Sequence, residues 1–178
     1  VNRGLWNFDE VRLDFYREAN GAFEAFKRGL YDFRVETEPL RWHEGYSFPA
    51  ARRGEVIRDT ITTGLPQPSE FLVFNTRRPV FADIHVRQAL TLLFDFEWIN
   101  RNYFFGLYRH SASFFAGSEL SAYGRAADAR ERTLLQPFAK SIPGDILDGS
   151  YRLPTTNGSG RDRRTLRAAL TLFEQAGY

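Results

Sequence analysis

The side chains that could do chemistry in this sequence are few and widely spaced. The histidines, His43, His85 and His110, form no H-E-x-x-H pair and have no carboxylate cluster at metal-ligand spacing. Among the 178 residues there is no Cys, which excludes disulfides, thiolate nucleophiles and cysteine-ligated metal sites. No G-x-S-x-G nucleophile motif occurs. We therefore expect no catalytic residues, no metal site and no cofactor.

A glycine-rich stretch, Gly158-Ser159-Gly160, precedes a cluster of arginines. It lacks the preceding strand and the remaining glycine of a phosphate-binding loop, so no phosphate site is expected. The arginines alternate with acidic residues, and the chain as a whole carries 24 Lys and Arg against 22 Asp and Glu. Interleaved charge creates no broad positive surface, which argues against nucleic-acid binding.

The segment that best fits a ligand site is Phe74-Asn75-Thr76-Arg77-Arg78-Pro79. A predicted strand ends here, and ligands of open α/β sheets usually bind where loops leave the strands. Asn75 and Thr76 can hydrogen-bond a polar backbone, and Arg77 can clasp a carboxylate. A second interpretation stays open, and the residues alone favour it: Asn75 and Arg77 brace the turn and the helix that follows.

The hydropathy pattern predicts the elements that would position these residues. Apolar and polar residues alternate, or apolar residues cluster, in four segments that we predict as strands: 11–17, 31–35, 56–62 and 71–75. Helices are expected after the caps Asn20, Asp83, Asp95 and Asp162, over 125–138, and as short turns near Pro39 and Pro49. Alternating helices and strands predict a single α/β domain over residues 1–178, with one mixed β-sheet flanked by helices. Residues 142–160 are expected to be irregular and exposed.

The ends of the chain and its apolar runs bear on its cellular context. No apolar stretch approaches the ~20 residues needed to span a bilayer, so we expect no membrane-spanning segment. The sequence begins with Val1 and shows no signal peptide. We interpret it as a piece of a longer protein.

Several motifs, in order along the whole chain, resemble family 5 of the extracellular solute-binding proteins of ABC importers. The general signature is Phe71 to Asp83, then Val86-Arg87-Gln88-Ala89-Leu90 and Phe94-Asp95, and Ala25 to Phe33 resembles a further family turn. The Yej-type peptide-binding subfamily is the most similar. Its motifs here are Trp6-Asn7-Phe8-Asp9, Phe94-Asp95-Phe96-Glu97-Trp98, Ser113-Phe114-Phe115, Ser118-Glu119-Leu120 and Pro154-Thr155-Thr156-Asn157-Gly158-Ser159-Gly160.

The resemblance implies one lobe of a two-lobed, class II periplasmic binding protein, with this chain forming most of the second lobe. It implies a periplasmic, monomeric component that captures oligopeptides, or murein or microcin-type peptides, for an ABC permease and its ATPase subunits, without nucleic acid or direct membrane contact. The ligand-facing candidates are then Asn75, Thr76 and Arg77, with Trp42 and Tyr46 as aromatic residues of the cleft wall. The carboxylate that pairs with the ligand's amino terminus would lie beyond Tyr178. A single lobe offers half the contacts, so the isolated chain is expected to fold without measurable peptide affinity.

Two alternatives from other classes remain. A cytoplasmic regulatory or nucleic-acid-binding module would show salt-dependent DNA binding. An α/β hydrolase would hold a titratable dyad in a cleft.

Overall fold

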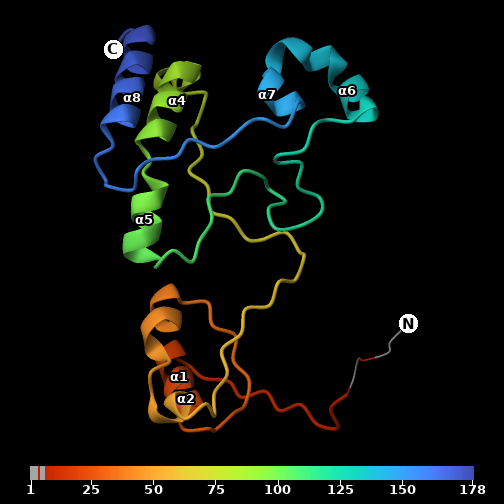
Figure 1. The fold of residues 1–178 in the computed structure, drawn as a ribbon, viewed down its shortest axis with the longest axis vertical. Coiled ribbons are helices and arrows are strands. Elements are labelled where there is room, and N and C mark those ends of the chain that lie inside the picture. The colour runs from red at the N-terminus through yellow and green to blue at the C-terminus, as the bar shows by residue number, and fades with distance from the viewer. Residues whose placement is uncertain (1–3, 5–6) are drawn as a thin grey trace. The chain divides into compact units, whose positions relative to one another are not determined.

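The computed structural model describes residue 4 and residues 7–178, which form helices joined by long extended and irregular segments (Figure 1). The chain divides into two compact units, Val1–Asp59 and Thr60–Tyr178. The first unit contains α1 (Ala19–Lys27), the π-helix η1 (Arg41–Gly45) and α2 (Pro49–Arg52). The second contains α3 (Pro79–Ala82), α4 (Ile84–Leu93), α5 (Phe96–Tyr103), α6 (Ala129–Leu135), the 3₁₀ helix η2 (Gln136–Ser141), α7 (Gly144–Leu147) and α8 (Arg163–Gln175).

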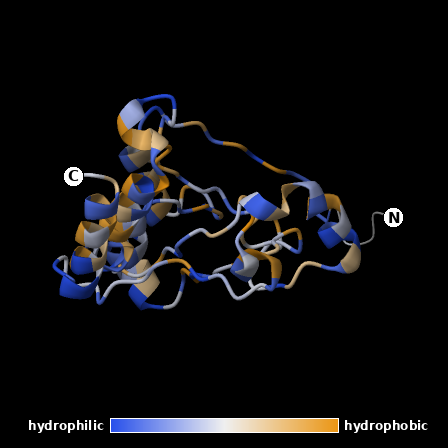
Figure 2. Cartoon of the chain, turned by 90° about the horizontal axis from the view of Figure 1, so that it is seen from above, coloured by the Kyte–Doolittle hydropathy of each residue, from blue (hydrophilic) through white to orange (hydrophobic). Residues whose placement is uncertain are grey.

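The predicted mixed β-sheet is wrong, and with it the α/β fold class. No residue in the described part of the chain lies in a strand. The four predicted strand segments are extended or irregular, and most of their apolar side chains face solvent, as with Phe15 (93% exposed), Ile57 (88%) and Val73 (87%). Figure 2 shows hydrophobic residues along the extended chain as well as on the helices. Alternation indicates which side chains share a face, but a strand also needs a neighbouring backbone to pair with, and no described segment provides one.

The helix caps predicted at three aspartates are confirmed. Asp83, Asp95 and Asp162 each accept a hydrogen bond from a backbone N–H in the first turn of α4, α5 and α8. The cap predicted at Asn20 is wrong, because α1 begins at Ala19 and Glu18 precedes it without a side-chain cap. A helix therefore starts where an Asp side chain can satisfy the free N–H groups, but α1 forms without such help.

The core of the second unit lies between α4 and α8, which run side by side (Figure 1). Val86 and Ala89 of α4 are buried, as are Thr165 and Ala169 of α8. Ala89 is fully buried and Ala169 is 1% exposed, so small side chains let the two helix backbones approach closely.

The arginine of the Val86-Arg87-Gln88-Ala89-Leu90 motif joins α3 to α4. Arg87 Nη1 donates to the carbonyl oxygens of Phe81 and Ala82, at 2.6 and 2.8 Å. These carbonyls end α3 and have no partner inside that short helix, so a cation there satisfies them and complements the helix dipole. In this structure the motif arginine holds a helix junction together.

The loop of residues 154–160 is fastened to the start of α5. The Thr156 hydroxyl contacts Asp95 Oδ1 and lies 2.9 Å from Glu97 Oε2, and the Thr156 N–H donates to that same Glu97 oxygen at 3.0 Å. The Gly160 N–H donates to Asp95 Oδ2 at 2.9 Å. Partial burial opposes ionisation of Asp95, but the bonds from Thr156, Trp98 and Gly160 outweigh it and lower the pKa of this carboxyl. Two motifs about 60 residues apart thus form one contact.

Glycine is required in this loop at two positions. Gly158 and Gly160 both have positive φ, 67° and 72°, a region that other residues rarely adopt. A Cβ on Gly160 would lie 3.1 Å from Trp98 Nε1, and one on Gly158 would lie 2.7 Å from an Arg101 nitrogen. Because the Gly158 and Gly160 N–H groups bond Thr156 and Asp95, the loop does not direct them at a phosphate.

Candidate ligand-binding site

A buried carboxylate organises the polar centre of the first unit. The Glu36 side chain is 2% exposed and ion-pairs with Arg34 and Arg41, at 3.2 and 3.3 Å. Its further hydrogen-bond donors are the Tyr46 hydroxyl at 3.3 Å and the N–H groups of Thr37 and Glu38, both at 3.1 Å. Every direction around the carboxylate is therefore satisfied, which is what a buried charge needs to be tolerated.

These contacts fix the protonation states of the cluster. Burial opposes ionisation of Glu36, but the Glu38 N–H and the Arg34 guanidinium outweigh it and lower the pKa of Glu36. Burial and the neighbouring Glu36 charge raise the pKa of the Tyr46 phenol. The carboxylate thus stays charged and the phenol stays a hydrogen-bond donor, so Tyr46 is held in one orientation.

Aromatic rings pack around this centre. Phe23 and Phe48 are buried, and Tyr46 contacts them with ring centroids 5.4 and 6.1 Å apart. Trp42 joins the group through an edge-on contact with Tyr46 at 5.9 Å. We call Phe23, Phe26, Trp42, Tyr46 and Phe48 the aromatic cluster. Such edge-to-face pairs add to the stabilisation that burial gives, so the cluster is a firm platform.

The π-helix η1 brings Trp42 and Tyr46 together. Gly45 lies in it, and a Cβ there would lie 2.8 Å from Arg41 Cγ and 3.1 Å from Phe23 Cζ. Only a residue without a side chain therefore fits between Arg41 and the aromatic cluster. Isolated π-turns occur frequently at functional sites, and this one displays two aromatic rings at the edge of a polar centre.

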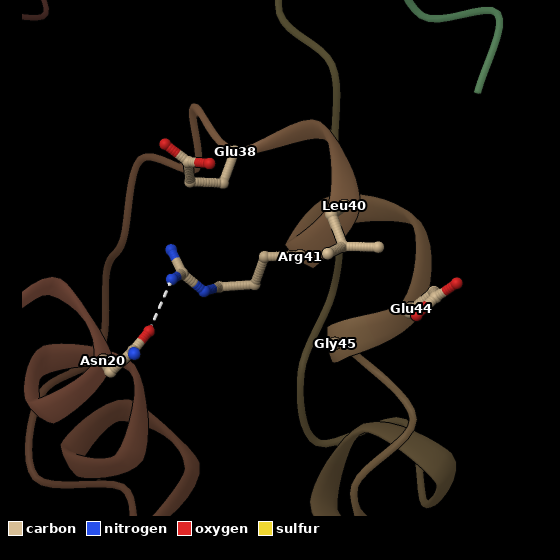
Figure 3. A pocket seen from close by; sticks show the side chains of 6 residues that line it. All are labelled: Asn20, Glu38, Leu40, Arg41, Glu44 and Gly45. Atoms are coloured by element: carbon tan, nitrogen blue, oxygen red, sulfur yellow. Dashed lines mark hydrogen bonds between the residues drawn. The ribbon is translucent and has the colours of Figure 1, made fainter. Parts of the chain in front are cut away.

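An open pocket of about 340 Å³ lies beside η1 (Figure 3). Arg41 reaches across it, and its Nη2 donates to Asn20 Oδ1 at 2.9 Å. Two carboxylates, Glu38 and Glu44, and the half-exposed Leu40 complete the wall. Donors and acceptors of both charges next to an apolar side chain suit a ligand with amide and mixed polar groups better than a lone anion.

The predicted residues of the second unit form a turn. The Arg77 N–H donates to Asn75 Oδ1 at 3.1 Å, and the Arg78 N–H donates to the Asn75 carbonyl at 3.0 Å. Asn75 thus braces the turn, as the second interpretation predicted. Asn75, Thr76 and Arg77 are all exposed. They belong to the second unit and Trp42 and Tyr46 to the first, so each set is a candidate on its own.

The remaining polar groups of the described residues include a partly buried histidine, His110. No group of three or more His, Asp or Glu residues in the described ranges is arranged to hold a metal ion. His110 stacks on Phe96, with ring centroids 4.7 Å apart, and its buried Nδ1 has no hydrogen-bond partner among the described residues. Burial lowers the pKa of His110. In the same described ranges, no helix has the length and apolar character to span a bilayer.

The sequence suggested Trp42 and Tyr46 as candidates but did not point to the residues that contact them. Arg34 lies in the predicted strand 31–35 and Glu36 directly follows it, and neither was named as a candidate. The available signal was the spacing of Arg34, Glu36 and Arg41 around an aromatic-rich segment. Residues of opposite charge close in sequence to several aromatic residues indicate that the charges form one polar centre among the rings.

Comparison with known proteins gives one family. The model for "Bacterial extracellular solute-binding proteins, family 5 Middle" matches residues 2–178. A putative binding protein of Brucella melitensis is 50% identical over 99% of this chain and 29% of its own length. Agrobacterium fabrum has a peptidoglycan-binding protein, YepA, that is 41% identical over 98% of the chain and 30% of its own length. A probable peptide-binding protein, YejA, of the same organism is 36% identical over 100% of this chain and 29% of its own length. The chain thus spans under a third of the length of these relatives.

Proposed function

This chain belongs to family 5 of the bacterial extracellular solute-binding proteins, and from that membership we propose that it is part of the peptide-capturing component of an ABC importer. The component works in the periplasm as a monomer and delivers its cargo to a permease driven by ATPase subunits. It acts by binding and has no catalytic role. The chain contributes most of one lobe, and the ligand is enclosed when a second lobe closes over it.

The observation that carries this proposal is the aromatic cluster with its pocket. A receptor for varied peptides must pair with the groups that all peptides share and tolerate different side chains. Trp42 and Tyr46 are partly exposed aromatic residues in and next to η1, and aromatic rings accept contacts from many kinds of side chain. Arg41, Asn20 and Glu38 line the adjacent pocket with the donors and acceptors that a peptide backbone needs. Asn75, Thr76 and Arg77 form a second, exposed set of ligand-facing candidates.

The cargo that we propose is an oligopeptide, with peptides released from murein as one subclass. The names of two relatives, a probable peptide-binding protein and a peptidoglycan-binding protein, support this range. Neither the nucleic-acid-binding nor the hydrolase alternative gains support, because the family is one of solute receptors.

Titration calorimetry on the intact gene product that contains this chain tests the proposal. A panel of tripeptides, with a murein tripeptide included, should give micromolar binding to the wild type. Trp42→Ala should weaken it about fivefold or more, since stacking on an aromatic face contributes roughly 1 kcal/mol or more. Tyr103→Ala, which removes an exposed aromatic residue of the second unit, is the matched control. Absence of peptide binding by the wild type, or equal binding by Trp42→Ala, would contradict it.

A further inference from the structure

Two asparagines of this chain are followed directly by glycine, in the pairs Asn20-Gly21 and Asn157-Gly158. In such a pair the backbone nitrogen of the glycine can attack the side-chain carbon Cγ of the asparagine, because glycine has no side chain to shield that nitrogen. The N–Cγ bond forms, the bond from Cγ to the NH₂ group breaks, and this group leaves as ammonia with the proton of the glycine N–H. Water then opens the resulting succinimide ring at either carbonyl and gives aspartate or isoaspartate, without oxidation or reduction.

The Gly21 nitrogen is available for this attack. Gly21 lies in the first turn of α1, which Glu18 precedes without a side-chain cap, and its N–H bonds no described residue. The residue is exposed, and a Cβ at this position would meet no other segment of the described chain within 4 Å. A helical backbone holds this nitrogen away from Cγ of Asn20, but an uncapped first turn opens at little cost.

Arg41 activates the Asn20 side chain toward the attack. Its Nη2 reaches across the pocket beside η1 and donates to Asn20 Oδ1 at 2.9 Å (Figure 3). Glu36 fixes the same guanidinium through Nη1 at 3.3 Å. As the nitrogen attacks Cγ, negative charge gathers on Oδ1, and a cationic donor already aimed at that oxygen stabilises it. The hydrogen bond that holds Asn20 in the pocket therefore also speeds its conversion.

The second pair, Asn157-Gly158, is protected by its own contacts. The Gly158 N–H is buried and donates to the Thr156 hydroxyl oxygen at 3.0 Å. The surroundings are crowded, because a Cβ on Gly158 would lie 2.7 Å from an Arg101 nitrogen. Asn157 Oδ1 accepts its hydrogen bond from the uncharged Ser159 N–H, at 3.0 Å. The attacking nitrogen is thus occupied and the oxygen lacks a cationic donor.

We propose that Asn20 is a site of spontaneous modification, at which succinimide formation yields aspartate and isoaspartate, and that the fold spares Asn157. The modification needs no ligand and no second protein, so the inference goes beyond peptide capture. An aspartate at position 20 places a carboxylate next to Arg41 and gives the pocket an additional negative charge. Molecules of this protein therefore change the charge of the pocket beside η1 as they age.

Peptide mapping by mass spectrometry on the intact gene product tests the proposal. The protein is incubated in mildly alkaline buffer, because the glycine N–H must lose its proton, and chromatography separates the aspartate and isoaspartate forms. Conversion at Asn20 should be about tenfold or more faster than at Asn157, which must first give up the hydrogen bond of the Gly158 N–H. In concentrated denaturant the two sites should convert at similar rates, because the difference comes from the fold.

Two variants test the chemistry at Asn20. Gly21→Ala shields the nitrogen, fits the open space and favours the helix, so it should slow the conversion about tenfold or more. Arg41→Lys keeps a cation next to Glu36, but its single nitrogen loses the bond to Asn20, which should slow the conversion about tenfold. A wild-type rate in Gly21→Ala would overturn the proposal, and a wild-type rate in Arg41→Lys would overturn the activating role of Arg41.

The other pair gives a matched test in the opposite direction. Thr156→Val removes the acceptor of the Gly158 N–H and should speed conversion at Asn157 about tenfold, with Asn20 unchanged. Thr156→Ser keeps the oxygen and should protect Asn157 as the wild type does. Equal rates at Asn20 and Asn157 in the folded wild type, or an unmodified Asn20 after the denatured chain has converted, would overturn the proposal. Peptide binding enters none of these measurements, so their outcome is independent of the proposed function.

Discussion

Removing the Thr156 hydroxyl should destabilise the second unit more than its single oxygen suggests. The hydroxyl donates a hydrogen bond to the ionised Asp95 carboxylate. It also accepts a hydrogen bond from the buried Gly158 N–H at 3.0 Å. A hydrogen bond to a charged group is worth about 1.5–3 kcal/mol, and leaving a buried N–H unsatisfied costs about 1 kcal/mol or more. Thr156→Val, which keeps the shape and loses the oxygen, should therefore lower the free energy of unfolding by about 2–4 kcal/mol.

Urea unfolding followed by far-ultraviolet circular dichroism measures this change. With a dependence of about 1–3 kcal/mol per molar urea, the midpoint should fall by roughly 1–2 M. Thr156→Ser keeps the oxygen and should stay within about 1 kcal/mol of the wild type. Thr133→Val is the control for a general effect of replacing threonine. The Thr133 hydroxyl donates to the Ala129 carbonyl within an exposed turn of α6 and contacts no charged group. Equal midpoints for Thr156→Val and Thr156→Ser would refute the reasoning.

Three further outcomes follow from the described contacts. Glu36→Gln should lower the free energy of unfolding, measured with a chemical denaturant, by about 3 kcal/mol or more, because it leaves the Arg34 and Arg41 charges unpaired. A variant as stable as the wild type would show that the ion pairs add nothing to stability. The lowered pKa of His110 means that the unfolded chain binds the proton more tightly, so thermal stability should fall as the pH drops below about 6.5. His110→Phe should lose that part of the pH dependence, and an identical pH profile in both proteins would count against it. Gly160→Ala should lower the melting temperature by several degrees, because the residue has positive φ and the added Cβ meets Trp98. Gly177→Ala is the control for the backbone effect alone, because Gly177 has positive φ but open space around it, and it should lower the melting temperature less.

Helices α4, α5 and α8 could be predicted from sequence because their signals are local, whereas α7 formed within residues 142–160, which were expected to be irregular. Asp83, Asp95 and Asp162 act within one turn of the backbone. The strands failed because pairing is a property of two segments. The alternation at residues 11–17 is real, yet it says nothing about whether a second backbone lies alongside.

The candidate site was predictable only in part, for the same reason. Trp42 and Tyr46 stood out as aromatic residues in a polar segment. Arg58, 16 residues from Trp42, donates a hydrogen bond to the Trp42 carbonyl oxygen and lies over its ring. It does so only because the chain folds back, and no spacing rule reports that. Asn75 shows the converse: its turn-bracing role depends on the two residues after it, so the sequence could suggest it directly.

The contact between the α5 start and the loop of residues 154–160 also has an evolutionary consequence. Thr156 and Gly160 each lose a hydrogen-bond partner when Asp95 changes, so replacement of Asp95 alone should be selected against, while joint replacements survive. Across homologous genes these three positions should therefore be inherited as a set. A homologue that has lost Asp95 is expected to carry a different residue at the position of Thr156 as well.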